Sequence, residues 1–211
     1  MGYRSPADSL YIGSARYRYG HGAVFGTARR GALTLQPHEP VVLVEHDPRW
    51  QGMFEAESRR IADALGQIPV QFEHIGSTAV AGLRAKPIID ILIGVRSLAD
   101  ADTCIQPMTA LDYEYVKRYE NRLPQRRFFR RCVNGATLFQ VHMVEHGGPF
   151  WHEHMLFRDA LRTYADLRDR YERLKAELAE KYRDQRESYA DAKGEFVNEV
   201  LRIAEARGLR A

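Results

Sequence analysis

The sequence predicts an α/β fold of the α+β kind with a helical C-terminal part, and three observations support this. Short aliphatic runs, above all residues 88–95, are typical of buried strands. Asn134-Gly135 lies between two further apolar segments and is a strong signal for a two-residue β-hairpin. From Leu161 onward, large apolar side chains recur every three or four residues, which predicts amphipathic helices.

The first elements of the chain are an extension, a strand and a helix. Residues 1–38 have no hydrophobic period and predict an irregular N-terminal extension. Residues 41–44 have the pattern of a short buried strand, and Asp47-Pro48 offers an N-cap and a first-turn proline. The helix that follows is expected to end at Gly66. Its apolar stripe consists of Trp50, Phe54, Ile61 and Leu65.

The central segment predicts strands at residues 70–75 and 88–95, separated by a small-residue turn that begins at Gly76. Ser97 is expected to cap a helix that runs to about residue 109. Residues 117–131 contain seven basic residues and one acid, which predicts a mobile basic segment.

The remaining sequence predicts a hairpin followed by helices, and Phe157-Arg158-Asp159 is expected to open the helical tail. Residues 128–133 and 136–144 flank the Asn-Gly turn as its two strands. The expected organisation is therefore an extension over residues 1–38, a core over 39–150 and a helical part over 151–211 that packs on the core.

Composition places the chain among ordinary globular proteins. Hydrophobic residues make up 45% and charged residues 28% of its 211 residues. Cys104 and Cys132 are too few for a disulfide framework, so we expect buried thiols and a reduced, cytoplasmic setting. No apolar run is long enough to span a membrane, so we expect no membrane partner. The net charge of +3 is too small to indicate nucleic acid, and the oligomeric state is not determined by the sequence.

Residues 74–90 contain the most chemically informative pattern. Gly76-Ser77 follows one apolar run, and Asp90 is the only charge in the next. Backbone N–H groups of a small-residue turn can bind phosphate, and a carboxylate on an adjacent strand can bind the divalent ion that offsets its charge. An acid among aliphatic residues is costly unless it meets a metal, a cation or several donors. The alternative is a buried salt bridge from Asp90 to Lys86 or Arg127.

Several motifs of the chain resemble the GrpB family. They are Glu73-His74-Ile75-Gly76-Ser77-Thr78-Ala79-Val80, Gly82-Leu83, Lys86-Pro87-Ile88-Ile89-Asp90, Arg127-Phe128-Phe129, His142, Phe157-Arg158-Asp159, Lys175 and Lys193. This family is similar to the nucleotidyltransferase superfamily of the polymerase-β type. The resemblance extends over about residues 40–205 and implies a nucleotidyltransferase-like mixed sheet flanked by helices, with C-terminal helices.

The resemblance also implies a site. In the superfamily, a Gly-Ser turn precedes a strand with two carboxylates at alternate positions, and a later strand supplies a third acid; these acids bind two magnesium ions. Here Asp90 matches the first carboxylate, Leu92 occupies the second position and His142 stands where the third acid is expected. Leu92 cannot bind a metal. The resemblance therefore implies one Mg²⁺ or Mn²⁺ ion on Asp90 with His142 as general base, or binding without a metal.

The remaining residues of the expected site bind nucleotide or substrate. They are His74, Gly76, Ser77, Thr78, Lys86, Arg127, Arg158, Lys175 and Lys193. Each also has a purely structural interpretation: a helix cap for the hydroxyls, a packed core imidazole for the histidines, and a solvated side chain for the lysines and arginines. Three further histidines, at 146, 152 and 154, are too loosely spaced to indicate a metal site.

Two functions are consistent with this pattern. The first is an enzyme that uses a nucleoside triphosphate, expected to be ATP, to transfer a nucleotidyl group to a small metabolite or to activate it for ligation. The second is a non-catalytic nucleotide- or coenzyme A-binding module, which Leu92 favours. RNA binding through residues 117–131 is a third interpretation, but the segment lacks the aromatic arrangement of known RNA-binding modules.

Overall fold

The computed structural model describes residues 40–68 and 70–210, so the predicted extension at 1–38 lies outside the described residues. A five-stranded mixed sheet has the order β1-β2-β5-β4-β3. Its strands are β1 (Val70–Ile75), β2 (Ile89–Val95), β3 (Glu114–Tyr115), β4 (Arg126–Val133) and β5 (Ala136–Glu145). β2 and β5 run parallel, whereas the other neighbours are antiparallel. The α+β fold class is confirmed.

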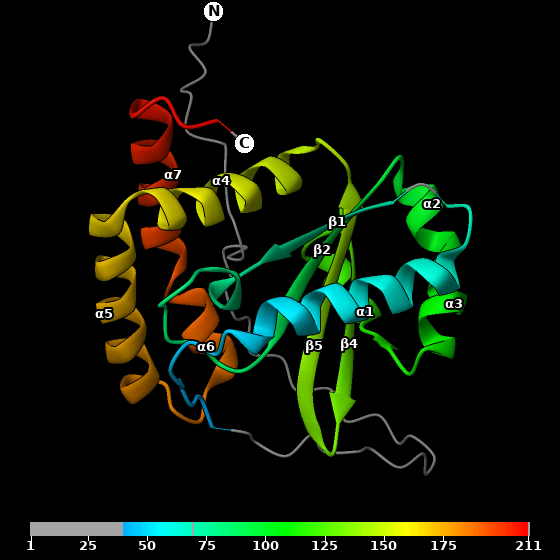
Figure 1. The fold of residues 1–211 in the computed structure, drawn as a ribbon, viewed down its shortest axis with the longest axis horizontal. Coiled ribbons are helices and arrows are strands. Elements are labelled where there is room, and N and C mark those ends of the chain that lie inside the picture. The colour runs from blue at the N-terminus through cyan, green and yellow to red at the C-terminus, as the bar shows by residue number, and fades with distance from the viewer. Residues whose placement is uncertain (1–39, 69, 211) are drawn as a thin grey trace, which may run out of the picture.

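Helices cover both faces of the sheet. The first three are α1 (Arg49–Leu65), α2 (Leu98–Thr103) and α3 (Ile105–Ala110). They pack on one face over the main apolar core, which contains Ile89, Ile91 and Ile93 of β2. The last four are α4 (Pro149–Thr163), α5 (Ala165–Lys181), α6 (Arg186–Asp191) and α7 (Gly194–Ala206). In the view of Figure 1, α5 and α7 lie on the left and α2 and α3 on the right.

Alternation along β2 and β5 decides which residues meet which helices. Odd-numbered residues of β2 belong to the core under α1–α3, whereas Leu92 packs with Val144 and with Phe150 of α4. Register places Asp90 beside Gln140 and Leu92 beside His142 across the parallel pair. Asp90, Leu92, Gln140 and His142 therefore share the face towards the C-terminal helices.

The hairpin and several helix ends agree with the sequence. Asn134 and Gly135 both have positive φ, 52° and 83°, as a type I′ turn requires. Gly66 ends α1 with φ of 62°. Ser97 caps α2 by accepting a hydrogen bond from the Asp100 backbone N–H. The helix expected to reach residue 109 is broken at Cys104 into α2 and α3.

Residues 41–44 do not form the predicted strand. Only Val44 pairs, in an isolated bridge to Ala85, and Val42 is 51% exposed. The segment hydrogen-bonds to a loop and to Arg183 instead of to a sheet strand, so its alternate side chains stay exposed.

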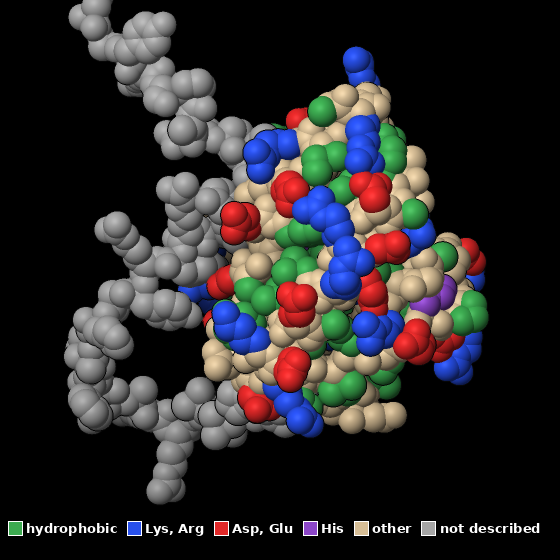
Figure 2. All heavy atoms as spheres, turned by 90° about the vertical axis from the view of Figure 1, so that its left-hand side faces the viewer, with side chains coloured by type: hydrophobic (Ala, Val, Ile, Leu, Met, Phe, Trp, Pro, Cys, Tyr) green, Lys and Arg blue, Asp and Glu red, His purple; other side chains and the backbone are tan. Residues whose placement is uncertain are grey.

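The basic segment 117–131 is ordered rather than mobile. It forms a 3₁₀ helix (Lys117–Asn121) and then β4, and three of its arginines pair with carboxylates. These ion pairs offset the charge of three of the seven basic residues of the segment. On another face of the molecule, Figure 2 shows acidic and basic side chains interleaved, without a patch of one sign.

Three smaller expectations need correction. Phe157–Asp159 lie well inside α4, not at the start of the helical part, because Pro149 already occupies its first turn. Pro48, not Asp47, takes the N-cap position of α1, although the Asp47 carboxylate still accepts from the Arg49 backbone N–H at 2.9 Å. Cys104 is buried as expected, but Cys132 is exposed.

Candidate functional site

A cleft of about 250 Å³ opens between the sheet and the C-terminal helices. One wall comes from the turn after β1 and from the facing residues of β2 and β5. The other wall comes from α4, α5 and the α6–α7 region. Eight of the predicted site residues line it: Gly76, Ser77, Thr78, Lys86, Asp90, His142, Lys175 and Lys193. The chain thus brings together residues that lie more than a hundred positions apart.

The turn after β1 fits tightly against Asp90. Gly76 has φ of 72°, and a Cβ atom at this position would clash with the Asp90 carboxylate. Only glycine therefore permits this approach of backbone to acid. Ser77 then begins a short 3₁₀ helix that ends at Ala79.

Thr78 and His74 hold this turn in place through buried hydrogen bonds. Thr78 is 3% exposed, and its hydroxyl donates to the Ile88 carbonyl oxygen at 3.1 Å. His74 Nε2 lies 3.0 Å from the same hydroxyl, and the ring stacks on Phe54 of α1. Burial lowers the pKa of His74 to about 4, so the imidazole is neutral at pH 7. His74 is not among the residues that line the cleft, and its ring lies beside the turn.

Asp90 is accessible from the cleft. Its side chain is 25% exposed, and Oδ1 lies 3.9 Å from His142 Nε2. Gln140, its neighbour on β5, also lines the cleft. The carboxylate is therefore not sealed inside the core, where a salt bridge alone would have to offset its burial.

His142 lies deeper and is enclosed by aromatic rings. Its ring is 5.1 Å from Phe128 and 6.1 Å from His154 between centroids. Burial lowers the pKa of His142, and burial lowers that of His154 to about 3. Both imidazoles are consequently neutral at pH 7. Arg126 Nη1 lies 3.1 Å from Nδ1 of His142.

Lysines from the loop before β2 and from the C-terminal helices form the basic end of the cleft. The ammonium groups of Lys193 and Lys86 lie 4.6 Å and 5.4 Å from the ring centroid of Tyr189. Lys175 is 1% exposed, donates to the Arg84 carbonyl oxygen and lies 3.4 Å from Glu172. Burial lowers the pKa of Lys175 to about 8, even with Glu172 beside it. Concentrated ammonium groups in a cleft favour an anionic ligand.

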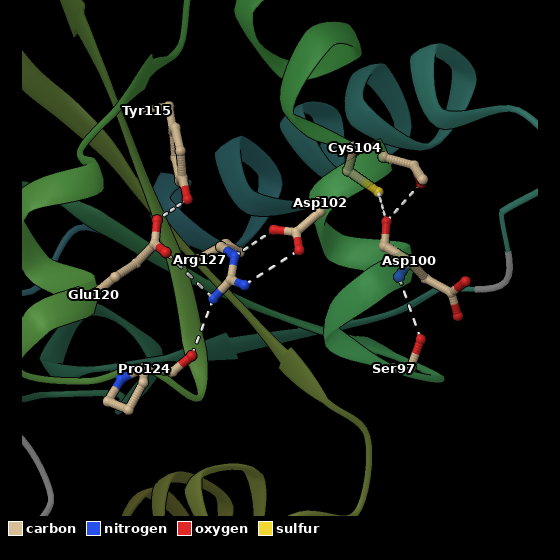
Figure 3. Close-up of polar contacts among 9 residues, drawn as sticks. Ser97, Asp100, Asp102, Cys104, Tyr115, Glu120, Pro124 and Arg127 are labelled. Carbon is tan, nitrogen blue, oxygen red and sulfur yellow. Dashed lines mark hydrogen bonds and ion pairs between the residues drawn. The ribbon is translucent and has the colours of Figure 1, made fainter.

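Arg127 is not brought to the cleft. It faces Met143 across the hairpin and so points to the side of α1–α3, whereas its neighbour Phe128 faces His142. Its guanidinium binds both carboxylate oxygens of Asp102, at 2.5 and 3.2 Å, and donates to the Pro124 carbonyl oxygen (Figure 3). Side chains of a strand alternate between its two faces, so Arg127, one position before Phe128, points away from the cleft.

Arg158 also lies outside the cleft, although it is buried. It donates to Glu73 at 2.6 Å, to Asp159 at 2.7 Å and to the His74 carbonyl oxygen at 3.2 Å. These bonds attach α4 to the end of β1. Arg158 therefore holds the strand that leads into the Gly76 turn.

Further residues of the site were not expected from the sequence. Gln140, His154 and Tyr189 line the cleft, and Arg126 supports His142 from behind. Gln140 was recoverable, because it shares the face of His142 two positions earlier on the same strand. The others depend on which helix turns face the sheet, and apolar spacing alone does not determine this.

The donor set of the described cleft residues offers a metal ion one carboxylate, that of Asp90. Among residues 40–68 and 70–210, no group of three His, Cys, Asp or Glu side chains could hold a metal ion. Leu92 is fully buried in an apolar cluster, so a second carboxylate is missing from β2. One carboxylate in an open cleft matches the way magnesium binds beside substrate phosphates.

The fold and the cleft define an α+β protein with an anion-favouring site between a mixed sheet and a helical tail. The chain belongs to the GrpB family: residues 40–202 match the family described as GrpB protein. A UPF0157 protein of Halalkalibacterium halodurans is 38% identical over 82% of this chain and 87% of its own length. The crystal structure of the conserved protein GrpB from Enterococcus faecalis has a TM-score of 0.71 and 29% identity, covering 79% of this chain and 99% of that one.

One relative belongs to a longer protein. A dephospho-CoA kinase of Mycobacterium leprae is 30% identical over 79% of this chain, and the match spans 47% of that protein. No helix within the described part of this chain is long and apolar enough to cross a membrane.

Proposed function

We propose that the protein is a nucleotidyltransferase-like enzyme that uses a nucleoside triphosphate, ATP in the first instance, and a divalent ion. It transfers a nucleotidyl group to a small metabolite or activates that metabolite for ligation. The observation that supports this most directly is the contact between the Gly76 turn and Asp90 at one side of a cleft whose other side carries lysines. Phosphate charge requires both donors and cations, and this cleft offers both.

Each part of the cleft has a defined task in this proposal. The backbone N–H groups at Ser77 and Thr78 bind phosphate oxygens, and Lys86, Lys175 and Lys193 offset their charge. Asp90 holds the Mg²⁺ or Mn²⁺ ion that accompanies the nucleotide, and the ion neutralises charge on the transferred group. His142 contacts the reacting group from the floor of the cleft. Arg127 and Arg158, which the resemblance included, act through the fold and not by touching the ligand.

Calorimetry with ATP tests the proposal. Wild-type protein is expected to bind ATP more tightly with magnesium than without it, and Asp90→Asn is expected to remove most of that difference, about tenfold in affinity. Asp102→Asn is the matched control, since Asp102 pairs with Arg127 on the other face of the sheet. If Asp90→Asn and wild type bind ATP equally in both conditions, the proposed role of Asp90 is wrong.

A second candidate is a non-catalytic nucleotide- or coenzyme A-binding module. The aliphatic Leu92 in place of a second carboxylate favours it, and so does the relationship to dephospho-CoA kinases. Release of pyrophosphate from ATP in the presence of a metabolite mixture separates the two. Turnover that Asp90→Asn abolishes supports the enzyme, whereas tight binding without any pyrophosphate supports the module.

A further inference from the structure

His142 lies between a cation and a carboxylate. Its Nδ1 is 3.1 Å from Arg126 Nη1, and its Nε2 is 3.9 Å from Asp90 Oδ1. An arginine side chain offers only N–H donors. Nδ1 of His142 must therefore accept the hydrogen bond, which leaves the single proton of the neutral ring on Nε2.

Arg126 is held by aromatic rings instead of by an acid. Its guanidinium carbon lies 4.8, 5.8 and 6.0 Å from the ring centroids of Phe128, Phe150 and Tyr119. No ion pair joins Arg126 to a carboxylate among the residues described. Burial lowers the pKa of Arg126 to about 10, so it remains charged at pH 7. A positive charge behind the ring opposes a second proton on His142 and strengthens Nε2–H as a donor.

We propose that Arg126 fixes His142 as the Nε2–H tautomer, and that His142 donates a hydrogen bond to a ligand oxygen bound beside Asp90. Arg126 is thus a positioning residue. The ligand half of this proposal rests on the proposed function, because it concerns the same cleft. It replaces the general-base role that the family resemblance implied for His142: Nδ1 is occupied by Arg126, and Nε2 already carries the proton.

The space between His142 and Asp90 suits this role. A separation of 3.9 Å is too long for a direct hydrogen bond. A hydroxyl oxygen that approaches from the cleft can lie about 2.8 Å from both atoms, where it accepts from Nε2–H and donates to Oδ1, since two such distances together exceed the gap. His154, the other titratable group packed near the ring, donates Nδ1–H to the Phe150 carbonyl oxygen at 2.8 Å and does not compete for this position.

Nitrogen-15 spectra of the histidine side chains test the tautomer in the full chain. At pH 7 and without nucleotide, the His142 signals, assigned with His142→Gln, are expected to show the Nε2–H pattern. Arg126→Lys, which keeps a donor, should retain the pattern. Arg126→Met, which fills similar space without a donor, should give a mixture of tautomers. Arg127→Met is the matched control and should leave the pattern unchanged, because Arg127 faces the opposite side of the sheet.

Addition of ATP with magnesium tests the donor role. The Nε2–H signal of His142 is expected to shift while the tautomer stays the same. A wild-type ring with its proton on Nδ1, or an Arg126→Met spectrum identical to wild type in a protein of normal thermal stability, overturns the role of Arg126. ATP that binds by calorimetry without moving the His142 signal overturns the donor role. Absence of ATP binding contradicts the proposed function, yet it leaves the tautomer result intact.

Discussion

Buried charged side chains have different surroundings on the two faces of the sheet. Under α1–α3, Glu57 is 5% exposed and receives hydrogen bonds from Tyr113, Arg60 and Arg131. Towards the C-terminal helices, Arg126 lies among aromatic rings and His142, with no carboxylate paired to it in the described part of the chain, and Lys175 is more buried than the neighbouring acid Glu172. On the first face, Glu57 and the two arginines that share it pair within the protein. On the second face, the buried Lys175 lines a cleft that a ligand can enter, which is the arrangement expected where a ligand supplies further negative charge.

The largest expected effect on stability concerns the face of the sheet under α1–α3, which we call the closed face. Glu57→Gln leaves Arg131, 18% exposed, and Arg60, 36% exposed, without their shared carboxylate, and loss of such charge-assisted hydrogen bonds costs about 1.5–3 kcal/mol. Urea unfolding should show this loss, whereas calorimetric ATP affinity should not change. Glu55→Gln, an exposed position on the same helix, is the control. A stability loss below about 1 kcal/mol for Glu57→Gln contradicts the interpretation of this face as a closed charge network.

The face of the sheet towards the C-terminal helices, which we call the open face, predicts that ATP affinity depends on pH through Lys175. Because burial lowers the pKa of Lys175 to about 8, its ammonium loses its proton near that pH, and ATP affinity should fall as the pH rises from 7 to 9. We expect Lys175→Met to weaken binding about tenfold at pH 7 and to remove this part of the pH dependence. Lys181→Met, at the exposed end of the same helix, is the control.

As the pH rises, the contribution of Lys175 to the stability of the fold should change in the direction opposite to ATP affinity. The folded-state pKa of Lys175, about 8, lies below its ordinary value of 10.5. Between these pH values the unfolded chain binds a proton that the folded chain does not, so the contribution of Lys175 to the free energy of unfolding rises with pH. Urea midpoints of wild type and Lys175→Met should therefore converge as the pH increases from 8 to 10. If their difference stays constant, Lys175 is not buried as a charged group.

The difference between the faces also explains which parts could be predicted. Strand β2, the Asn134-Gly135 hairpin and the Gly76 turn follow from local patterns, since apolar runs and positive-φ residues act within a few positions. The Gly76–Asp90 pair follows too, because both lie in one motif. Lys175 came only from the family resemblance, and no local pattern distinguishes it from a solvated lysine of the same helix.

Arg126 and Arg127 mark the limit of sequence reasoning at the site. Both are arginines next to the same phenylalanines, and the choice between them depends on which residue of β4 faces His142. Register between β4 and β5 determines this, and a slip of one residue exchanges the faces. The sequence shows that the hairpin exists but not which of its faces the C-terminal helices cover.

Arg127→Met is therefore expected to have the smallest effect on stability and ATP affinity, and it allows the most direct comparison with the neighbouring Arg126. Its carboxylate partner Asp102 is half exposed, and pairs of this kind contribute at most about 1 kcal/mol to stability. ATP affinity should remain as in wild type, measured by the same calorimetry. A stability loss of this size with unchanged binding places Arg127 with the charge pairs of the closed face. A tenfold loss of ATP affinity without loss of stability would instead show that Arg127, which faces α1–α3, contributes to the binding site. The assignment of the site to the C-terminal side of the sheet would then have to be abandoned.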